Sequence, residues 1–154
     1  MKIKVNKTTN FFDVISACYE TDPDLLERYH VLAPVDLQTA INHTVQQFLK
    51  SSEMGFYTMY ELRIDGNLVG YFGREVPHKN MQLLCGFFIL PKYRTKEVML
   101  KFWRIVRSKF EKEIWTYIFD KNTRAVQYLT KKGFIFVGRE YIAHEQQYAI
   151  FLKL

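Results

Sequence analysis

The segment NTRAVQYLTKKGF, residues 122–134, decides the fold of this chain. It follows residues 114–119, IWTYIF, a run of strand-forming residues. Asp120 and Asn122 are typical helix-start residues, and Gly133 is typical of the left-handed residue that closes a helix. The segment therefore predicts a strand, a short helix and a return into the next strand.

A second strand and helix precede this segment. Residues 83–90, LLCGFFIL, form an almost unbroken apolar run, which is typical of a strand buried on both faces, and Pro91 ends it. Residues 98–110 carry apolar side chains at helical spacing. Two further strands are predicted after the segment, over residues 134–139 and 147–154.

The first half of the chain predicts a short strand followed by helices. Residues 2–5 alternate polar and apolar side chains, as a strand does. Apolar residues at helical spacing predict three helices, over residues 11–19, from Leu25 to Tyr29 and over residues 36–50.

A β-hairpin is predicted next. Residues 56–64 and 68–76 are rich in strand formers, and Asp65-Gly66-Asn67 between them favours a tight turn, because Gly66 can adopt a positive φ. We expect a loop over residues 77–80.

This order of elements predicts an α/β (α+β) fold with one mixed sheet of about six or seven strands, flanked by about four helices. No repeat, low-complexity segment or Gly/Ser/Pro-rich linker divides the sequence. We therefore expect a single domain over residues 1–154.

The charge of the chain is unevenly distributed. The net charge is +6, and residues 92–154 hold 14 Lys and Arg against 6 Asp and Glu, a net charge of +8. Residues 1–91 have a net charge of −2. Either the C-terminal part binds an anion, such as a phosphorylated cofactor or nucleic acid, or the basic residues solvate the outer faces of two helices.

Composition excludes several classes of protein. With 48% apolar residues the chain is not disordered, and no apolar run approaches the ~20 residues that span a bilayer. Two isolated cysteines and four scattered histidines do not form a disulfide framework or a metal site. We expect a cytoplasmic protein with no metal and no membrane partner.

Three features together resemble the GCN5-related N-acetyltransferase (GNAT) family. Residues 122–134 match the family pattern Asn-x-x-Ala-(Ile/Val)-x-x-x-x-(Lys/Arg)-x-Gly-Phe. The buried strand that leaves through residues 88–94 into a helix is similar to the strand and loop that hold the acyl thioester and pyrophosphate in that family. The strand order, which covers essentially the whole chain, is the third feature.

The resemblance implies binding of acetyl-CoA and direct transfer of its acetyl group to an amine, on a small molecule or a protein. The positions it implies for cofactor binding are Phe88, Ile89, Arg94, Thr95, Lys96, Glu97, Val98, Met99, Asn122, Arg124 and Ala125.

The pyrophosphate loop departs from the family pattern (Gln/Arg)-x-x-Gly-x-(Gly/Ala). The aligned residues 94–99 read RTKEVM, so Glu97 and Met99 stand where small residues are usual. A carboxylate facing the pyrophosphate would be repelled by about 1–4 kcal/mol. Alternatively, Glu97 points outward as an acid favoured by the helix N-terminus.

The proton-transfer residues also depart from the family. Leu129 occupies the position where the family often has a tyrosine, and Tyr128 is rotated from it by ~100°. Tyr128 is a candidate proton donor, although we expect it to pack in the core. Glu61, Glu75 and His78 are candidate bases on or beside the hairpin, and each is equally a solvated strand residue.

These departures leave an alternative open, a catalytically inactive GNAT-like protein with a structural or interaction role. Such a protein would bind itself or another protein, and it would be a bacteriophage-encoded, virion-associated one if it resembles the degenerate members known from phages. A nucleic-acid-binding protein ranks last, because no recognition motif accompanies the basic residues.

Overall fold

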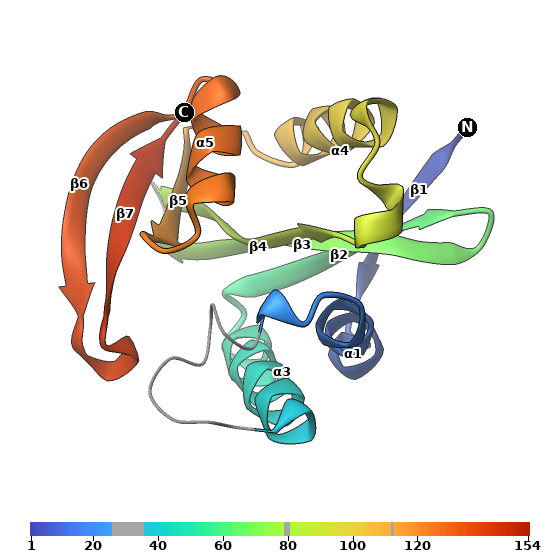
Figure 1. The fold of residues 1–154 in the computed structure, drawn as a ribbon, viewed down its shortest axis with the longest axis horizontal. Helices are drawn as coiled ribbons and strands as arrows, with labels where there is room; N and C mark the ends of the chain where they lie inside the picture. Colours follow the sequence, from blue (N-terminus) through green and yellow to red (C-terminus); the bar gives the residue numbers. More distant parts are fainter. Residues whose placement is uncertain (26–35, 79–80, 112) are drawn as a thin grey trace.

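The structure is a computed structural model that describes residues 1–25, 36–78, 81–111 and 113–154 (Figure 1). A seven-stranded sheet has the order β1-β2-β3-β4-β5-β7-β6. Its strands are β1 (Ile3–Thr8), β2 (Tyr57–Ile64), β3 (Asn67–His78), β4 (Met81–Ile89), β5 (Ile114–Phe119), β6 (Ile135–Ile142) and β7 (Gln147–Lys153). Within the described residues, the α-helices with defined bounds are α1 (Phe11–Thr21), α3 (Leu37–Glu53), α4 (Lys96–Ser108) and α5 (Thr123–Lys131).

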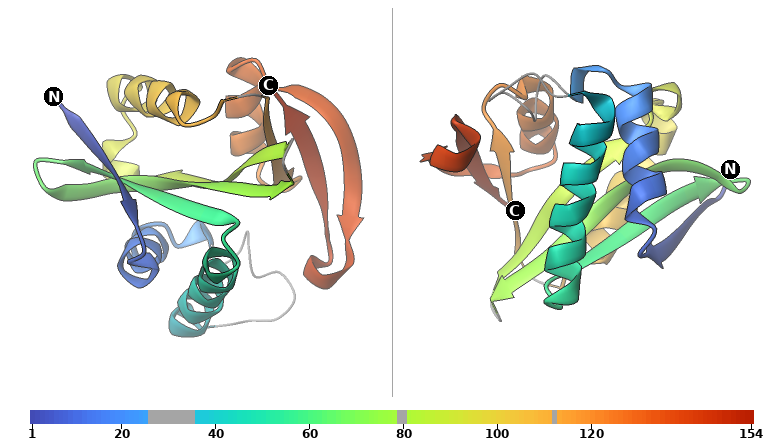
Figure 2. Two further views of the ribbon diagram at one scale, coloured as in Figure 1. Left: turned by 180° about the vertical axis from the view of Figure 1, so that it is seen from behind. Right: turned by 90° about the horizontal axis from the view of Figure 1, so that it is seen from below.

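The sheet is mixed, as predicted. Within the described residues, β4 and β5 are the one parallel pair, and the other neighbouring strands are antiparallel. Figures 1 and 2 show α1 and α3 side by side on one face of the sheet and α4 and α5 on the other. This arrangement confirms the α/β (α+β) fold class.

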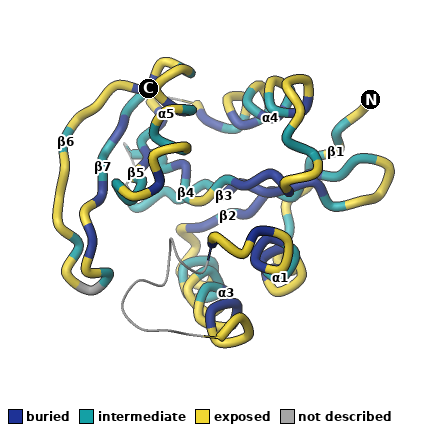
Figure 3. Tube along the Cα trace, viewed as in Figure 1, coloured by how far each residue is buried: buried dark blue, intermediate teal, exposed yellow. Residues whose placement is uncertain are grey.

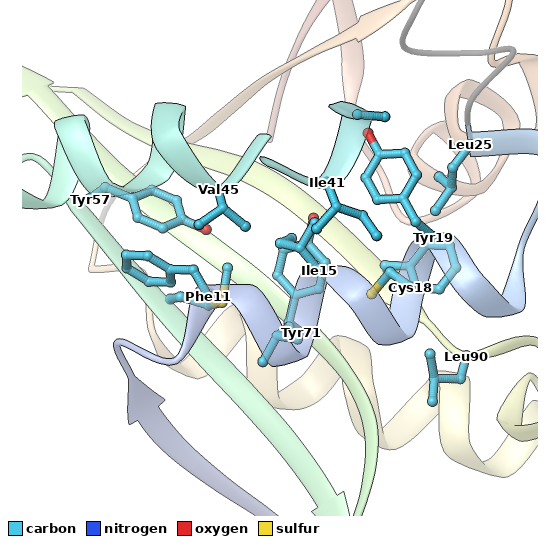
Figure 4. Close-up of a cluster of buried hydrophobic side chains, with 14 residues drawn as sticks. Phe11, Ile15, Cys18, Tyr19, Leu25, Ile41, Val45, Tyr57, Tyr71 and Leu90 are labelled. Carbon is cyan, nitrogen blue, oxygen red and sulfur yellow. The ribbon is translucent and has the colours of Figure 1, made fainter. Parts of the chain in front are cut away.

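Each face of the sheet has its own hydrophobic core. Figure 4 shows the core on the α1/α3 side, where Ile15, Cys18 and Tyr19 of α1 lie near Ile41 and Val45 of α3. On the opposite side, α4 buries an apolar stripe against the sheet. Figure 3 shows that β6, at the sheet edge, is mostly exposed.

The hairpin turn forms as its sequence predicts, but β3 extends further than expected, to His78, and residues 79–80 lie outside the described residues. Asp65 and Gly66 both have positive φ, 50° and 80°, as a tight two-residue turn requires. The predicted loop over residues 77–80 is wrong for Pro77 and His78, which end β3. The β3–β4 register is irregular between Glu75 and His78, and such a bulge accommodates a proline that cannot donate to the ladder.

The remaining expectations concern a second short helix near Leu25 and the absence of membrane-spanning helices. Most of the predicted helix from Leu25 to Tyr29 lies outside the described residues. Among the helices that the structure describes, none is both long and apolar enough to cross a membrane.

A bulge in β4 alters which side chains face each core. Between the pairs Phe72↔Phe87 and Arg74↔Leu84, β4 has one residue more than β3. Gly86 lies in this stretch with a φ of 75°, which an L side chain rarely adopts. The extra residue places Leu84 and Phe87 in the same core, that of the α4 side.

The β4–β5 pair separates soon after it begins. Its backbone pairing covers Gln82↔Ile114 and Leu83↔Trp115. The next contact is made by a side chain, because the buried Thr116 hydroxyl donates a hydrogen bond of 2.8 Å to the Leu84 carbonyl. Thr116 therefore marks the point at which the two parallel strands begin to diverge.

Thr116→Val should lower the free energy of unfolding by about 1–2 kcal/mol, because it leaves the buried Leu84 carbonyl without its donor. Chemical denaturation measures this change. Thr58→Val, at a half-buried position of β2, is the matched control and should change stability less. Equal effects of the two substitutions would contradict a specific role for the Thr116 bond.

Candidate functional site

A cavity of about 710 Å³ lies where β4 and β5 diverge. Residues 84–89 of β4 and 117–119 of β5 line it, together with residues of α1, α3, α4 and α5. The divergence of β4 and β5 thus leaves a cavity whose volume is typical of small-molecule pockets, which measure ~300–1,000 Å³.

The cavity reaches both faces of the sheet. On the α4/α5 side its wall includes Phe87, Ile89 and Ile118, which pack in the core of that side. On the α1/α3 side it includes Cys85 and Phe88, which pack in the other core. The cavity therefore has two compartments, one on each face, joined through the gap between β4 and β5.

Backbone groups of β4 face this gap. The Leu90 N–H donates to the Val69 carbonyl at 2.8 Å, so the next residue back, Ile89, turns its N–H and C=O away from β3. By the same alternation Phe87 does so as well. The Arg94 Nε donates to the Ile89 carbonyl at 2.8 Å, which is consistent with this direction.

Arg94 connects the end of β4 to α1. Its Nη2 lies 3.2 Å from Oδ2 of the buried Asp22, the residue that caps the C-terminus of α1. Its guanidinium also lies 4.9 Å from the centre of the Phe88 ring. Arg94 therefore holds the cavity wall together as well as adding positive charge to it.

The N-terminus of α4 follows Arg94 directly in the sequence. The Thr95 hydroxyl accepts from the Val98 N–H at 3.2 Å, whereas the N–H groups of Lys96 and Glu97 have no acceptor inside the helix. The Glu97 side chain is 64% exposed and pairs with Lys101 at 3.0 Å. Of the two alternatives for Glu97, the outward geometry is the one observed.

The predicted cofactor residues divide into two groups. Those that line the cavity are Phe88, Ile89, Arg94, Met99, Asn122, Arg124 and Ala125. Thr95, Lys96 and Glu97 form the start of α4 outside the lining, and Val98 is buried in the core.

Helix α5 brings Tyr128 to the cavity on the α4/α5 side. The Tyr128 ring lies 6.3 Å from the Phe87 ring and 6.5 Å from the Trp103 ring. Its hydroxyl oxygen is buried with no hydrogen-bond partner among the described residues, and burial raises the pKa of Tyr128 to about 12. Leu129, at the position where the resemblance places a tyrosine, is instead fully buried in the core.

The three candidate bases have different surroundings. The Glu61 carboxylate is held by Arg63 at 3.0 Å and lies outside the cavity lining. Glu75 also lies outside the lining, but its charge acts on Cys85, which does line the cavity. The side chain of His78 lies outside the described residues.

Cys85 is a neutral thiol in this setting. Burial, followed by the charge of Glu75 and its hydrogen bond, raises the pKa of Cys85 to about 12. A thiol with such a pKa is a poor nucleophile at neutral pH. Cys85 is therefore a neutral residue of the cavity wall near Glu75 rather than a reactive group.

Sequence reasoning missed most of the wall on the α1/α3 side. Tyr19 of α1, Thr44 and Gln47 of α3 and Glu145 of the turn between β6 and β7 all line the cavity. Glycine inside an apolar strand was a usable signal for the β4 bulge. No feature of the sequence indicated that Glu145 lines the cavity, because polar residues are common in turns.

No family model and no curated protein matches the sequence of this chain. Solved structures do match its fold. An acetyltransferase of Thermus thermophilus is 10% identical with a TM-score of 0.78, and the match covers 100% of this chain and 97% of that one. The PaiA N-acetyltransferase of Thermoplasma acidophilum, in complex with coenzyme A, is 15% identical with a TM-score of 0.64 and full coverage of both chains.

A GNAT-family acetyltransferase of Bacillus cereus is 14% identical with a TM-score of 0.64, over 100% of this chain and 97% of that one. Identities this low show similarity of fold alone. The strand order, the diverging β4 and β5 and these matches together show that the chain has the GNAT fold.

Proposed function

We propose that the protein is an acetyl-CoA-dependent N-acetyltransferase that transfers the acetyl group directly to an amine. The observation that carries this proposal is the cavity that passes through the sheet between β4 and β5. A thioester held on the α4/α5 side and an amine held on the α1/α3 side can meet there without a covalent enzyme intermediate.

The residues around the α4/α5 compartment fit acetyl-CoA. Apolar side chains and the gap-facing backbone groups of Phe87 and Ile89 suit the pantetheine arm, with its alternating methylene and amide groups. The first N–H groups of α4 suit the pyrophosphate, and Arg124 adds a cation to the cavity wall. When bound, acetyl-CoA would supply an activated acyl carbon and a thiolate leaving group.

Two proton transfers would then be carried out by side chains of the protein, one to the departing sulfur and one from the amine. The Tyr128 hydroxyl lies on the α4/α5 side and bonds none of the described residues, and it would donate its proton to the departing sulfur. Glu75, whose charge acts on Cys85 in the cavity wall, would accept the proton of the amine through an ordered water. Glu61, held by Arg63, and His78 are the other candidates for this second role.

The proposal is tested by incubating the protein with acetyl-CoA and a panel of primary amines. Release of free thiol with an equal amount of acetylated amine, identified by mass spectrometry, is the expected result. Thiol release no faster than in buffer with every amine would overturn the proposal.

Glu97→Gln should change the affinity for acetyl-CoA by less than about threefold, because an exposed charge paired with Lys101 contributes little. Titration calorimetry measures this affinity. Glu20→Gln, at an exposed position of α1, is the control. Tenfold tighter binding by Glu97→Gln alone would show that the carboxylate faces the phosphates after all.

One observation favours the alternative of an inactive protein with an interaction role. Three consecutive apolar residues of the edge strand β6, Ile135, Phe136 and Val137, are 60%, 63% and 48% exposed. If this strand mediates self-association, light scattering should detect a dimer that Phe136→Ser dissociates. A monomer at all concentrations would count against this role.

A further inference from the structure

The compartment on the α1/α3 side has an apolar floor. Figure 4 shows part of it, where Ile15 and Cys18 of α1 and Leu25, which follows that helix, lie in one hydrophobic cluster. All three line the cavity, and Phe48 of α3 and Phe88 of β4 complete the floor. Because these five residues belong to the core and also border the cavity, the compartment reaches into the interior of this side.

The polar lining residues of α3 lie nearer to solvent. His43 and Gln47 are exposed, and their Nε2 atoms lie 3.1 Å apart. The Thr44 hydroxyl is hydrogen-bonded to the Tyr19 hydroxyl at 3.1 Å. The floor presents hydrocarbon and aromatic surface, together with the Cys18 thiol, which behaves as a small apolar group when buried. A ligand group that needs hydrogen bonds is therefore better accommodated near α3 than on the floor.

The floor is connected to the α4/α5 side through the bulge of β4. Cys85, Gly86 and Phe88 of this stretch all line the cavity. A Cβ at Gly86 would lie 3.1 Å from the hydroxyl oxygen of Tyr71, another lining residue, so glycine keeps this part of the cavity open. A chain that begins at a thioester on the α4/α5 side can pass the β4 backbone here and continue to the floor.

We propose that the acyl donor carries a linear acyl chain of medium length, such as hexanoyl, whose methylene groups pack on the floor. This inference rests on the proposed function and names the class of its acyl donor. Acetyl-CoA binds the same site, but its short acyl group leaves the floor uncovered. The amine then approaches from the polar part of the compartment, beside α3.

The chemistry of transfer is the same for the longer chain. The nitrogen of a neutral amine forms a bond to the acyl carbon while the carbon–sulfur bond breaks and its electron pair goes to sulfur. The nitrogen gives up one proton as the amide forms, and the sulfur takes up one proton to become the thiol of free CoA.

Titration calorimetry with acetyl-CoA and hexanoyl-CoA tests the inference. Each fully buried methylene group strengthens binding about fourfold, and hexanoyl has four more of them than acetyl. We expect hexanoyl-CoA to bind at least about tenfold more tightly than acetyl-CoA, with one molecule per chain.

Two variants place additional atoms in the path of the acyl chain. Cys18→Met and Cys85→Met each lengthen a side chain that lines the compartment, and each should reduce the preference for hexanoyl-CoA to less than about threefold. Either variant serves if the other does not fold. Val45→Ile is the matched control, because it enlarges a buried residue of the same core outside the cavity lining, and it should keep the preference.

The outcomes separate failure of this inference from failure of the proposed function. Equal affinities, or weaker binding of hexanoyl-CoA, would overturn the medium-chain donor, and acetylation of an amine would still support the acetyltransferase. A preference that neither methionine variant reduces would place the chain away from the floor and would also overturn the inference. A preference abolished by these variants supports the acyl site even if no amine is acylated.

Discussion

Tyr128→Phe should lower kcat about 100-fold and leave the affinity for acetyl-CoA unchanged. A general acid typically contributes a factor of at least ~10² to the rate, and phenylalanine keeps the ring packing against Phe87 and Trp103 while removing the hydroxyl. Because the pKa of Tyr128 is raised to about 12, the hydroxyl keeps its proton throughout the pH range in which the enzyme would work. Steady-state kinetics with a purified amine acceptor measure the loss.

The matched control is Tyr141→Phe, which removes a hydroxyl from an exposed position of β6. Its kcat should equal that of the unmodified protein. The role of Tyr128 would be contradicted if Tyr128→Phe kept full kcat, and Tyr128 would then be a packing residue, as the one-residue offset from the family's tyrosine predicts.

Gly70→Ala should lower the free energy of unfolding by about 3 kcal/mol, among the largest losses expected of a single added methyl group. Gly70 pairs with Ile89, and a Cβ there would overlap the Phe88 carbonyl oxygen and lie 2.9 Å from Cδ1 of Ile89. Both neighbours belong to the β4 segment that lines the cavity. The substitution should therefore also weaken acetyl-CoA binding by displacing that segment.

Gly138→Ala separates this effect from the general cost of changing a strand glycine. A Cβ at Gly138 meets nothing within 4 Å, so stability should stay within about 0.5 kcal/mol. Urea denaturation of both variants gives the comparison. Equal stability of the two would show that β3 and β4 are less closely apposed at Gly70 than the structure indicates.

The sequence predicted the fold because its signals are local and strong. The apolar run of residues 83–90, the turn at Asp65-Gly66 and the helix closed by Gly133 each depend on a few neighbouring residues, and each is observed. The predicted loop was wrong at Pro77 and His78, because a proline usually ends a strand and only the pairing of β3 with β4 shows that a bulge accommodates it.

The candidate site was less predictable, because it depends on where distant elements meet. Seven of the residues that the resemblance implies for cofactor binding line the cavity. The resemblance could not show that the Glu97 side chain turns outward to Lys101, because a sequence pattern does not give the direction of a side chain. Nor could a sequence place Glu145 beside α1 and α3, since the turn that carries it is positioned by the whole sheet.

Acetyl-CoA binding to the purified protein tests the central claim most directly. Titration calorimetry should show saturable binding of one acetyl-CoA per chain, and the melting temperature should rise with ligand concentration. At a hundredfold excess over Kd the stabilisation should reach about 2.7 kcal/mol. No heat of binding and no shift of the melting temperature at millimolar acetyl-CoA would contradict the assignment of the cavity between β4 and β5 to this ligand.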